Sequence, residues 1–277
     1  MSMQPPPAGV DRHLPVTGAL LRYRDEGRGP PVLLIHGWTL DLDMWAPQVA
    51  ALGGAFRLIR FDRRGFGLSS GRASLTADLQ DALSLCDALQ LGRLACVGMS
   101  QGARVALHLC RIAPERLSCL VLDGPPPLLA EQAVDAGDDV PLAEYRRLIA
   151  GGDLETFRRR WMRHPLMQLE SRSPATHALL RQMTTRYGGN DLLQELPAAE
   201  DHWDRAAIGS LRTPALIVTG EHDLPARLRA ADALAGALPL AQRASVAGAR
   251  HIPNLDNPLS YNTVLRAFLE RHAGTTR

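Results

Sequence analysis

A serine between two glycines stands in the segment Gly98–Gly102, whose sequence is GMSQG. The apolar run Leu94–Val97 precedes it and a helical pattern follows it, so Ser100 is predicted to lie on a sharp strand-to-helix turn. Such a turn strains the backbone of its central residue and needs small neighbours, which the glycines supply. Ser100 is therefore a candidate nucleophile held above a sheet. The alternative is a glycine-rich loop with a capping serine.

A serine nucleophile needs a histidine as its base, and the histidine needs an acid that orients it. Asp223 follows the apolar run Ala215–Thr219 within the segment GEHD, and His251 follows the run Arg243–Val246 within the segment GARH. The order serine, acid, histidine along the chain is that of one type of catalytic triad. We predict that Ser100, Asp223 and His251 form this triad.

Other acids and histidines near these positions are given lesser roles. Glu221 stands two residues before Asp223, but the acid is expected further into the loop that follows the strand. His222 is interpreted as a loop residue. Three further histidines, His164, His177 and His202, lack the spacing of metal ligands.

The loop after the apolar run Val32–Ile35 carries His36, Gly37 and Trp38. It is expected beside the nucleophile, where the backbone N–H groups of Trp38 and Gln101 would form an oxyanion hole. An ordinary turn, with the Trp38 side chain packed in the core, is the alternative. Four residues are expected to contact the substrate, namely His36, Gly37, Met99 and Trp161.

Short apolar runs alternate with helical patterns, which is typical of an α/β protein with a mostly parallel, doubly wound sheet. The predicted strands are Val32–Ile35, Arg57–Phe61, Leu94–Val97, Leu117–Leu122, Ala215–Thr219 and Arg243–Val246. The predicted helices are Met44–Ala51, Leu75–Leu89, Ala103–Ala113, Ala226–Leu238 and Tyr261–His272. Residues 125–207 break the alternation with three prolines and then helical patterns. We predict a helical cap at 125–207, inserted into a core made of residues 1–124 and 208–277.

The cap contains a run of arginines within Arg158–Arg163. These arginines could recognise a carboxylate on the substrate. A solvated helix face is the favoured interpretation, because acids such as Glu144 and Glu155 stand in the same segment.

The 277 residues carry 31 basic and 29 acidic side chains, and a net charge of +2 favours neither nucleic acid nor a membrane as partner. The chain contains no lysine, which excludes a lysine Schiff base. Four cysteines in apolar stretches show neither CxxC pairing nor metal-ligand spacing. Buried free thiols and a cytoplasmic location are therefore expected. No secretory signal and no membrane-spanning run is visible.

Four segments are considered together with GMSQG: Leu33–Trp38 (LLIHGW), Phe61–Ser69 (FDRRGFGLS), Gly220–Asp223 and Gly248–His251. Together they resemble the α/β-hydrolase superfamily, over residues from 30 to the C-terminus. The resemblance implies a core sheet of eight strands, of which six are readable in the sequence, and a structural role for the turn at 62–69. One departure is Arg250, because members of the family often have glycine before the histidine.

Within the superfamily the chain resembles small carboxylesterases and 3-oxoadipate enol-lactonases, which share the Gly-x-Ser-x-Gly turn and the ending Asn254–Pro258 (NLDNP). The cofactor-free haloperoxidase or perhydrolase branch is also similar, through HGW and DRRG. Haloalkane dehalogenases and epoxide hydrolases are disfavoured, because they carry an aspartate at the position of Ser100.

These observations predict a serine hydrolase that cleaves a small carboxylic ester or lactone through an acyl-enzyme, with no cofactor and no metal. One alternative is a C–C bond hydrolase or a cofactor-free perhydrolase or haloperoxidase on the same triad. The other is a non-catalytic ligand-binding protein that retains the fold. The pocket is expected between core and cap, with apolar walls.

Overall fold

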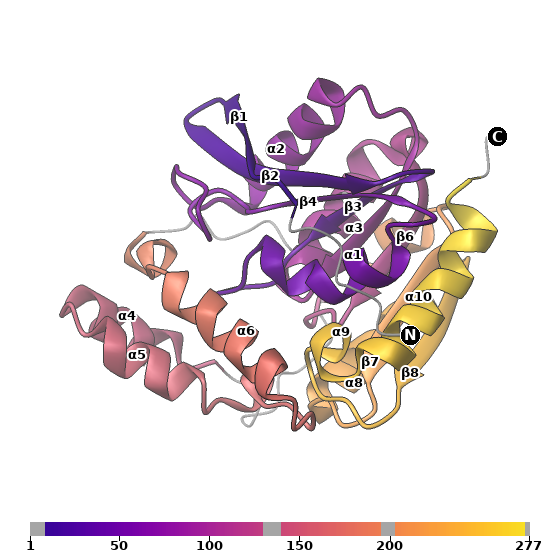
Figure 1. Cartoon of the computed structure of the whole chain (residues 1–277). Coiled ribbons are helices and arrows are strands. Elements are labelled where there is room, and N and C mark those ends of the chain that lie inside the picture. Colours follow the sequence, from indigo (N-terminus) through magenta and orange to yellow (C-terminus); the bar gives the residue numbers. More distant parts are fainter. Residues whose placement is uncertain (1–8, 130–139, 195–202, 275–277) are drawn as a thin grey trace, which may run out of the picture.

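The computed structural model describes residues 9–129, 140–194 and 203–274. Within these ranges eight strands form one sheet in the order β1-β2-β4-β3-β5-β6-β7-β8 (Figure 1). The strands are β1 (Arg12–Val16), β2 (Ala19–Gly27), β3 (Pro31–Ile35), β4 (Arg57–Phe61), β5 (Leu94–Met99), β6 (Leu117–Asp123), β7 (Ala215–Gly220) and β8 (Ala241–Val246). The helices are α1 (Ala46–Leu52), α2 (Leu75–Ala88), α3 (Gln101–Ile112), α4 (Leu142–Ala150), α5 (Leu154–Trp161), α6 (Pro174–Arg186), α7 (Arg205–Gly209), α8 (Pro225–Ala237), α9 (Pro253–Asp256) and α10 (Pro258–His272).

The sheet is mostly parallel, which confirms the predicted fold class. Strands β3 to β8 pair in parallel, whereas β2 pairs antiparallel with both β1 and β4. All six predicted strands are present, with ends that differ by at most two residues. The β1–β2 hairpin was not among them. Its strand β2 carries Arg22, Arg24, Asp25 and Glu26, so no continuous apolar run marks it.

Two hydrophobic layers cover the two faces of the sheet. Along β3, Val32 and Leu34 face the layer of α1 and α10, whereas Leu33 and Ile35 face the layer of α2, α3 and α8. Because both faces of these strands are buried, their sequences are apolar throughout and do not alternate. Cys86, Cys96, Cys110 and Cys119 are buried in this core as free thiols, as the sequence predicts.

Helices α4, α5 and α6 come between β6 and β7 and lie together at one side of the sheet (Figure 1). Their aromatic side chains, including Phe157 and Trp161, belong to the same cluster as core residues such as Trp45. Trp203 packs elsewhere, against His108 and Arg111 of α3. Helix α7 spans the predicted boundary at 207/208. In the described residues no helix has the length and apolar character that a membrane crossing needs.

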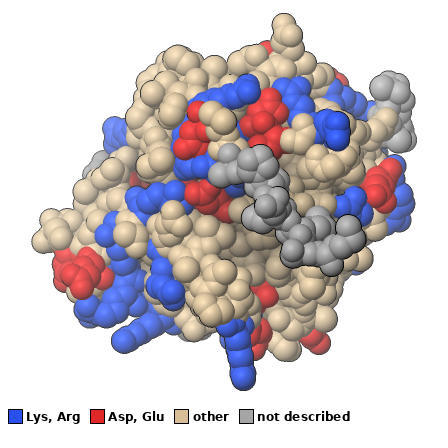
Figure 2. All heavy atoms as spheres, in the orientation of Figure 1, with Lys and Arg blue, Asp and Glu red and all other residues tan. Residues whose placement is uncertain are grey.

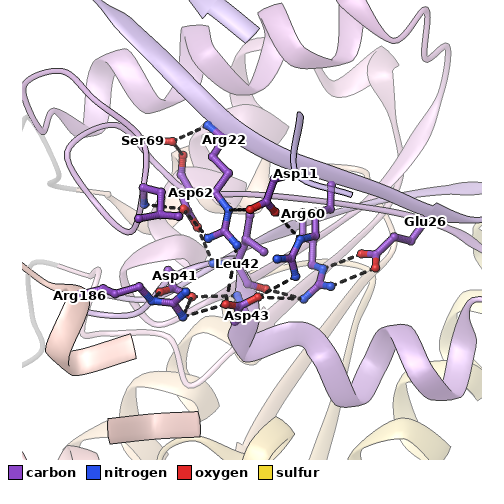
Figure 3. A network of polar contacts seen from close by, with 12 residues as sticks. Asp11, Arg22, Glu26, Asp41, Leu42, Asp43, Arg60, Asp62, Ser69 and Arg186 are labelled. Carbon is purple, nitrogen blue, oxygen red and sulfur yellow. Dashed lines mark hydrogen bonds and ion pairs between the residues drawn. The ribbon is translucent and has the colours of Figure 1, made fainter. Parts of the chain in front are cut away.

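A cluster of charged side chains, of which Arg22, Asp41, Arg60 and Asp62 are buried, joins β2, β4 and the loop after β3 to the end of α6 (Figure 3). Its main members are Asp11, Arg22, Arg24, Glu26, Asp41, Asp43, Arg60, Asp62 and Arg186. Arg186, the last residue of α6, contacts Asp41 at 2.9 Å and Asp43 at 2.8 Å. Burial, and then the negative charge of Asp62, raise the pKa of Asp41 to about 7, although Arg186 opposes the shift. This cluster ties the inserted helices to the loop after β3.

Candidate active site

Ser100 lies on the turn between β5 and α3. Its backbone has φ 50° and ψ −112°, and its N–H donates to the carbonyl of Asp123 on β6 at 2.7 Å. A Cβ at Gly98 would stand 2.2 Å from the Gly102 carbonyl oxygen, and a Cβ at Gly102 would stand 2.4 Å from that of Ile35. The turn is strained and closely packed, and it leaves Ser100 partly exposed.

His251 lies between Ser100 and Asp223. Its Nε2 is 3.3 Å from the Ser100 Oγ, and its Nδ1 is 3.0 and 3.1 Å from the two carboxylate oxygens of Asp223. Both His251 and Asp223 are buried. Since Nδ1 faces a carboxylate, it carries the proton in the neutral ring and leaves Nε2 as an acceptor. Three loops that are distant in sequence thus bring together a hydroxyl, an imidazole and a carboxylate.

The two other loop residues of the GEHD segment lie apart from this arrangement. Glu221 is exposed, and its carboxylate accepts the Gly248 N–H at 2.9 Å. His222 is also exposed and lies beside Glu221 and Glu170.

The loop after β3 packs against the Ser100 turn. A Cβ on Gly37 would stand 2.7 Å from the Met99 sulfur and 3.5 Å from the Ser100 Cβ. Within the described backbone, no carbonyl accepts a hydrogen bond from the N–H of Trp38 or of Gln101.

His36 is fully buried and supports this loop through hydrogen bonds. Its Nε2 accepts the Arg63 N–H at 2.9 Å, and its Nδ1 donates to the Gly37 carbonyl at 2.7 Å. Burial, and then the charge of Arg63, lower the pKa of His36 well below its usual value, so the ring is neutral. Arg63 in turn donates to Gln101 Oε1 at 2.6 Å and to Asp78 at 2.9 Å. The expectation that His36 and Gly37 contact the substrate is not supported, because neither lines the cavity described next.

A cavity of about 300 Å³ opens beside Ser100 and His251. Trp38 and Met99 line it from the core, and Trp161 lines it from α5. Further apolar residues of the wall are Leu40, Val140, Leu166, Met167, Leu192 and Ile252. A concave, mostly apolar site with a few polar groups is suited to a small organic ligand.

The arginines singled out in the sequence are not among the residues that line this cavity. Arg250 pairs with Glu170 at 2.7 Å, and Arg160 pairs with Glu144. Figure 2 shows acidic and basic side chains interspersed on one face of the molecule. The arginines that do line the cavity are Arg104, Arg146 and Arg227. Single arginines on separate helices give no signal in a sequence, which is why these three were missed.

Metal-ligating side chains do not gather in the described part of the chain. No group of three or more His, Cys, Asp or Glu residues there could hold a metal ion.

The comparison with known families agrees with this geometry. A family model described as the alpha/beta hydrolase fold matches residues 30–258. The chain belongs to this family. The resemblance read from the sequence is thereby confirmed, and so is membership of a family of hydrolases.

Individual relatives within the α/β-hydrolase family differ in their named activities. The chain is 27% identical to a pimeloyl-[acyl-carrier protein] methyl ester esterase of Nitrosomonas europaea over 259 residues, which are 87% of this chain and 96% of that protein. It is 40% identical to a Synechocystis protein named as a non-heme chloroperoxidase, over 116 residues that are 39% of this chain and only 41% of that protein.

Solved structures of the family superpose over almost the whole chain. A thermophilic esterase from Thermogutta terrifontis is similar with a TM-score of 0.80 and 27% identity, covering 95% of this chain and 100% of that one. An enol-lactonase from Burkholderia xenovorans is similar with a TM-score of 0.75 and 25% identity, covering 94% and 100%.

Proposed function

We propose that this chain is a serine hydrolase that cleaves a small carboxylic ester or lactone. The observation that carries the proposal is the alignment of Ser100, His251 and Asp223 at the wall of an apolar cavity, with 3.3 Å between Ser100 Oγ and His251 Nε2. The esterase and the enol-lactonase among the similar proteins support the same reaction class. We also infer that residues 1–124 and 208–277 form the catalytic core and 125–207 a cap, and that the protein is cytoplasmic.

The first half of the reaction forms an acyl-enzyme. His251 Nε2 takes the proton of the Ser100 hydroxyl as the oxygen attacks the ester carbonyl. The oxygen of the tetrahedral intermediate is stabilised by the N–H groups of Trp38 and Gln101. His251 then gives its proton to the leaving alkoxide. In a lactone the alkoxide stays tethered to the acyl group.

The second half releases the acid. His251 deprotonates a water molecule, which attacks the acyl carbonyl of the ester on Ser100. The Ser100 oxygen leaves and recovers its proton from His251. Asp223 holds the imidazole in one tautomer throughout and stabilises its charged form.

The decisive experiment replaces the nucleophile. Ser100→Ala should bind ligands and remain folded, but its hydrolysis of p-nitrophenyl acetate should fall close to background. Ser210→Ala is a matched control, because the Ser210 hydroxyl donates to the Ala207 carbonyl at the end of α7 and Ser210 is not among the residues that line the cavity. If Ser100→Ala retained most of the activity, the assignment would be refuted. If the wild-type protein hydrolysed no ester at all, the non-catalytic alternative would replace it.

A second candidate function has a specific observation in its favour, which is the match to a non-heme chloroperoxidase. In a perhydrolase, hydrogen peroxide replaces water in the second half of the reaction, so the acyl-enzyme is converted to a peracid and free Ser100. Peracid formed from acetate and hydrogen peroxide is measured by its oxidation of bromide. A peracid rate above the ester hydrolysis rate would favour this candidate. A C–C bond hydrolase would use the same three residues, so this alternative is distinguished from an esterase only by the substrate that the protein cleaves.

A further inference from the structure

The backbone next to the proposed oxyanion donor is strained. Thr39 directly follows Trp38, and its φ is 61°. A β-branched residue rarely adopts this left-handed conformation, which therefore persists only where surrounding contacts hold it. Thr39 is 1% exposed, and its hydroxyl accepts a hydrogen bond from the indole N–H of Trp161 at 2.7 Å. Trp161 is the last residue of α5, so the contact comes from the inserted helices.

A second contact from the same helices holds the side chain of Trp38. The indole N–H of Trp38 donates to Asp191 Oδ2 at 2.7 Å, and the Tyr187 hydroxyl donates to Asp191 Oδ1. The Trp38 and Trp161 rings meet edge to face, with centroids 4.8 Å apart. Each tryptophan thus donates its N–H across the boundary between core and insertion, in opposite directions.

A third contact lies two residues further along the loop, where Arg186 contacts Asp41 (Figure 3). The segment from Trp38 to Asp41 is therefore held at three points by residues of 125–207. By contrast, the side chain of the other proposed donor, Gln101, accepts a hydrogen bond from Arg63, which lies outside residues 125–207.

We propose that Asp191 and Trp161 are positioning residues, which hold the Trp38–Thr39 backbone so that the Trp38 N–H points to the developing oxyanion. This inference rests on the proposed function. It gives the insertion a part in the chemical step in addition to its part in enclosing the substrate. Preorganised donors stabilise a transition state because they need no reorganisation when the charge develops.

Asp191 and Trp161 both line the cavity, so a direct contact with substrate is the main competing explanation. Both carboxylate oxygens of Asp191 already accept a hydrogen bond from within the protein, and the indole N–H of Trp161 already donates to Thr39. A role in substrate binding would change KM, whereas a positioning role changes the chemical step.

The test compares two variants from different elements. Asp191→Asn replaces one carboxylate oxygen by an NH₂ group, which is a donor. The asparagine side chain therefore cannot accept the Trp38 N–H and the Tyr187 hydroxyl on separate oxygens. Trp161→Phe keeps an aromatic ring but removes the N–H that reaches Thr39. For both, kcat for p-nitrophenyl acetate should fall about tenfold or more, up to the ~10²–10³ that losing a whole oxyanion donor costs. KM should change little.

Phenylboronic acid supplies a readout that does not depend on turnover. The Ser100 oxygen bonds to boron, the hydroxyl proton passes to His251, and the tetrahedral boronate places one oxygen at the oxyanion position. Its affinity, measured by calorimetry, should weaken by the same factor as kcat/KM in both variants. Asp153→Asn is the matched control, because Asp153 caps α5 by accepting the Thr156 N–H and does not line the cavity. It should leave kcat and boronate affinity unchanged.

Two results would overturn the inference. Unchanged kcat and boronate affinity in both folded variants would show that Trp38 needs neither contact. A raised KM with unchanged kcat and boronate affinity in either variant would make the replaced residue a substrate-binding residue. Failure of the proposed function looks different, since the wild-type protein would then bind phenylboronic acid no better than Ser100→Ala does.

Discussion

Gly124, the residue after β6, lies directly against the imidazole of His251. Its φ is 50°, and a Cβ there would stand 3.0 Å from Cε1 and 3.2 Å from Nδ1 of the ring. Nδ1 is the atom that faces Asp223. A methyl group at Gly124 would therefore press on the side of the imidazole that the carboxylate orients.

Gly124→Ala should lower kcat for ester hydrolysis. A displacement of about 1 Å in a reacting group costs on the order of 10²-fold in rate. Gly18→Ala is the matched control, because its φ is 75° and a Cβ there would meet no atom within 4 Å. Both variants carry the backbone strain, about 1–2 kcal/mol, but only the first touches the ring. Equal rates in the two folded variants would contradict the expected displacement.

Asp223→Asn should lower kcat by up to about four orders of magnitude, because an amide does not hold the imidazole in the required tautomer. Glu221→Gln should have little effect. Its side chain is exposed and accepts the Gly248 N–H, which an amide oxygen can also accept. Steady-state hydrolysis of one ester by both variants provides the comparison. If the ranking were reversed, the acid of the triad would be Glu221.

Asp41→Asn should become more stable relative to the wild-type protein as the pH rises. Burial raises the pKa of Asp41 to about 7 in the folded state, against 3.8 as its ordinary value. The folded protein therefore retains a proton that the unfolded chain has lost. The contribution of Asp41 is fully present below about pH 4 and is lost as the pH rises through about 7. Each unit of pKa difference corresponds to about 1.4 kcal/mol.

Urea denaturation between pH 5 and pH 8 measures this effect as a change in the free energy of unfolding. Asp153→Asn should show no such trend against the wild-type protein. Its exposed carboxylate has a pKa lowered by the Thr156 N–H and is ionised throughout that range. A constant difference between Asp41→Asn and the wild-type protein would show that Asp41 is ionised as well.

Neutral p-nitrophenyl esters should be hydrolysed with kcat/KM rising from acetate to a short optimum, then falling for long chains. Each methylene buried against the apolar wall adds about 0.8 kcal/mol until the cavity is full. Monoesters of dicarboxylic acids of equal length should be poorer substrates. If they were better, and if Arg146→Ala erased the advantage, the arginines of the cavity would bind a substrate carboxylate.

The order of the core elements and the three aligned residues could be predicted from the sequence, because each depends on a local pattern. A buried parallel strand is a continuous apolar run, and the loops after such strands meet at one edge of the sheet. Ser100 also has a local signature, since only glycines fit at 98 and 102.

The features that the sequence did not predict depend on contacts between distant segments. Strand β2 is filled with charges, and these become favourable only where Asp11, β4 and the loop after β3 supply partners. His36 looks like a substrate contact because it stands beside Trp38, but its ring turns inward to the Arg63 N–H. Asp191 is one acid among many in its segment, and its contact with Trp38 joins residues 153 positions apart.

The insertion leaves the sheet after β6 and returns to it at β7, and these two strands are hydrogen-bonded neighbours. They are parallel, so the chain leaves the sheet at one edge and returns to it at the other. Near the two ends of the insertion, however, the Trp203 N–H donates to the Leu128 carbonyl at 3.4 Å, which holds these ends close together. The entropy of closing such a loop grows only slowly with its length, by about 0.6 kcal/mol for each doubling. Segments of different length can therefore be exchanged at this position with little effect on how the sheet folds. We expect that an exchanged segment without partners for Trp38 and Thr39 would enclose a new substrate but that the enzyme would hydrolyse it slowly.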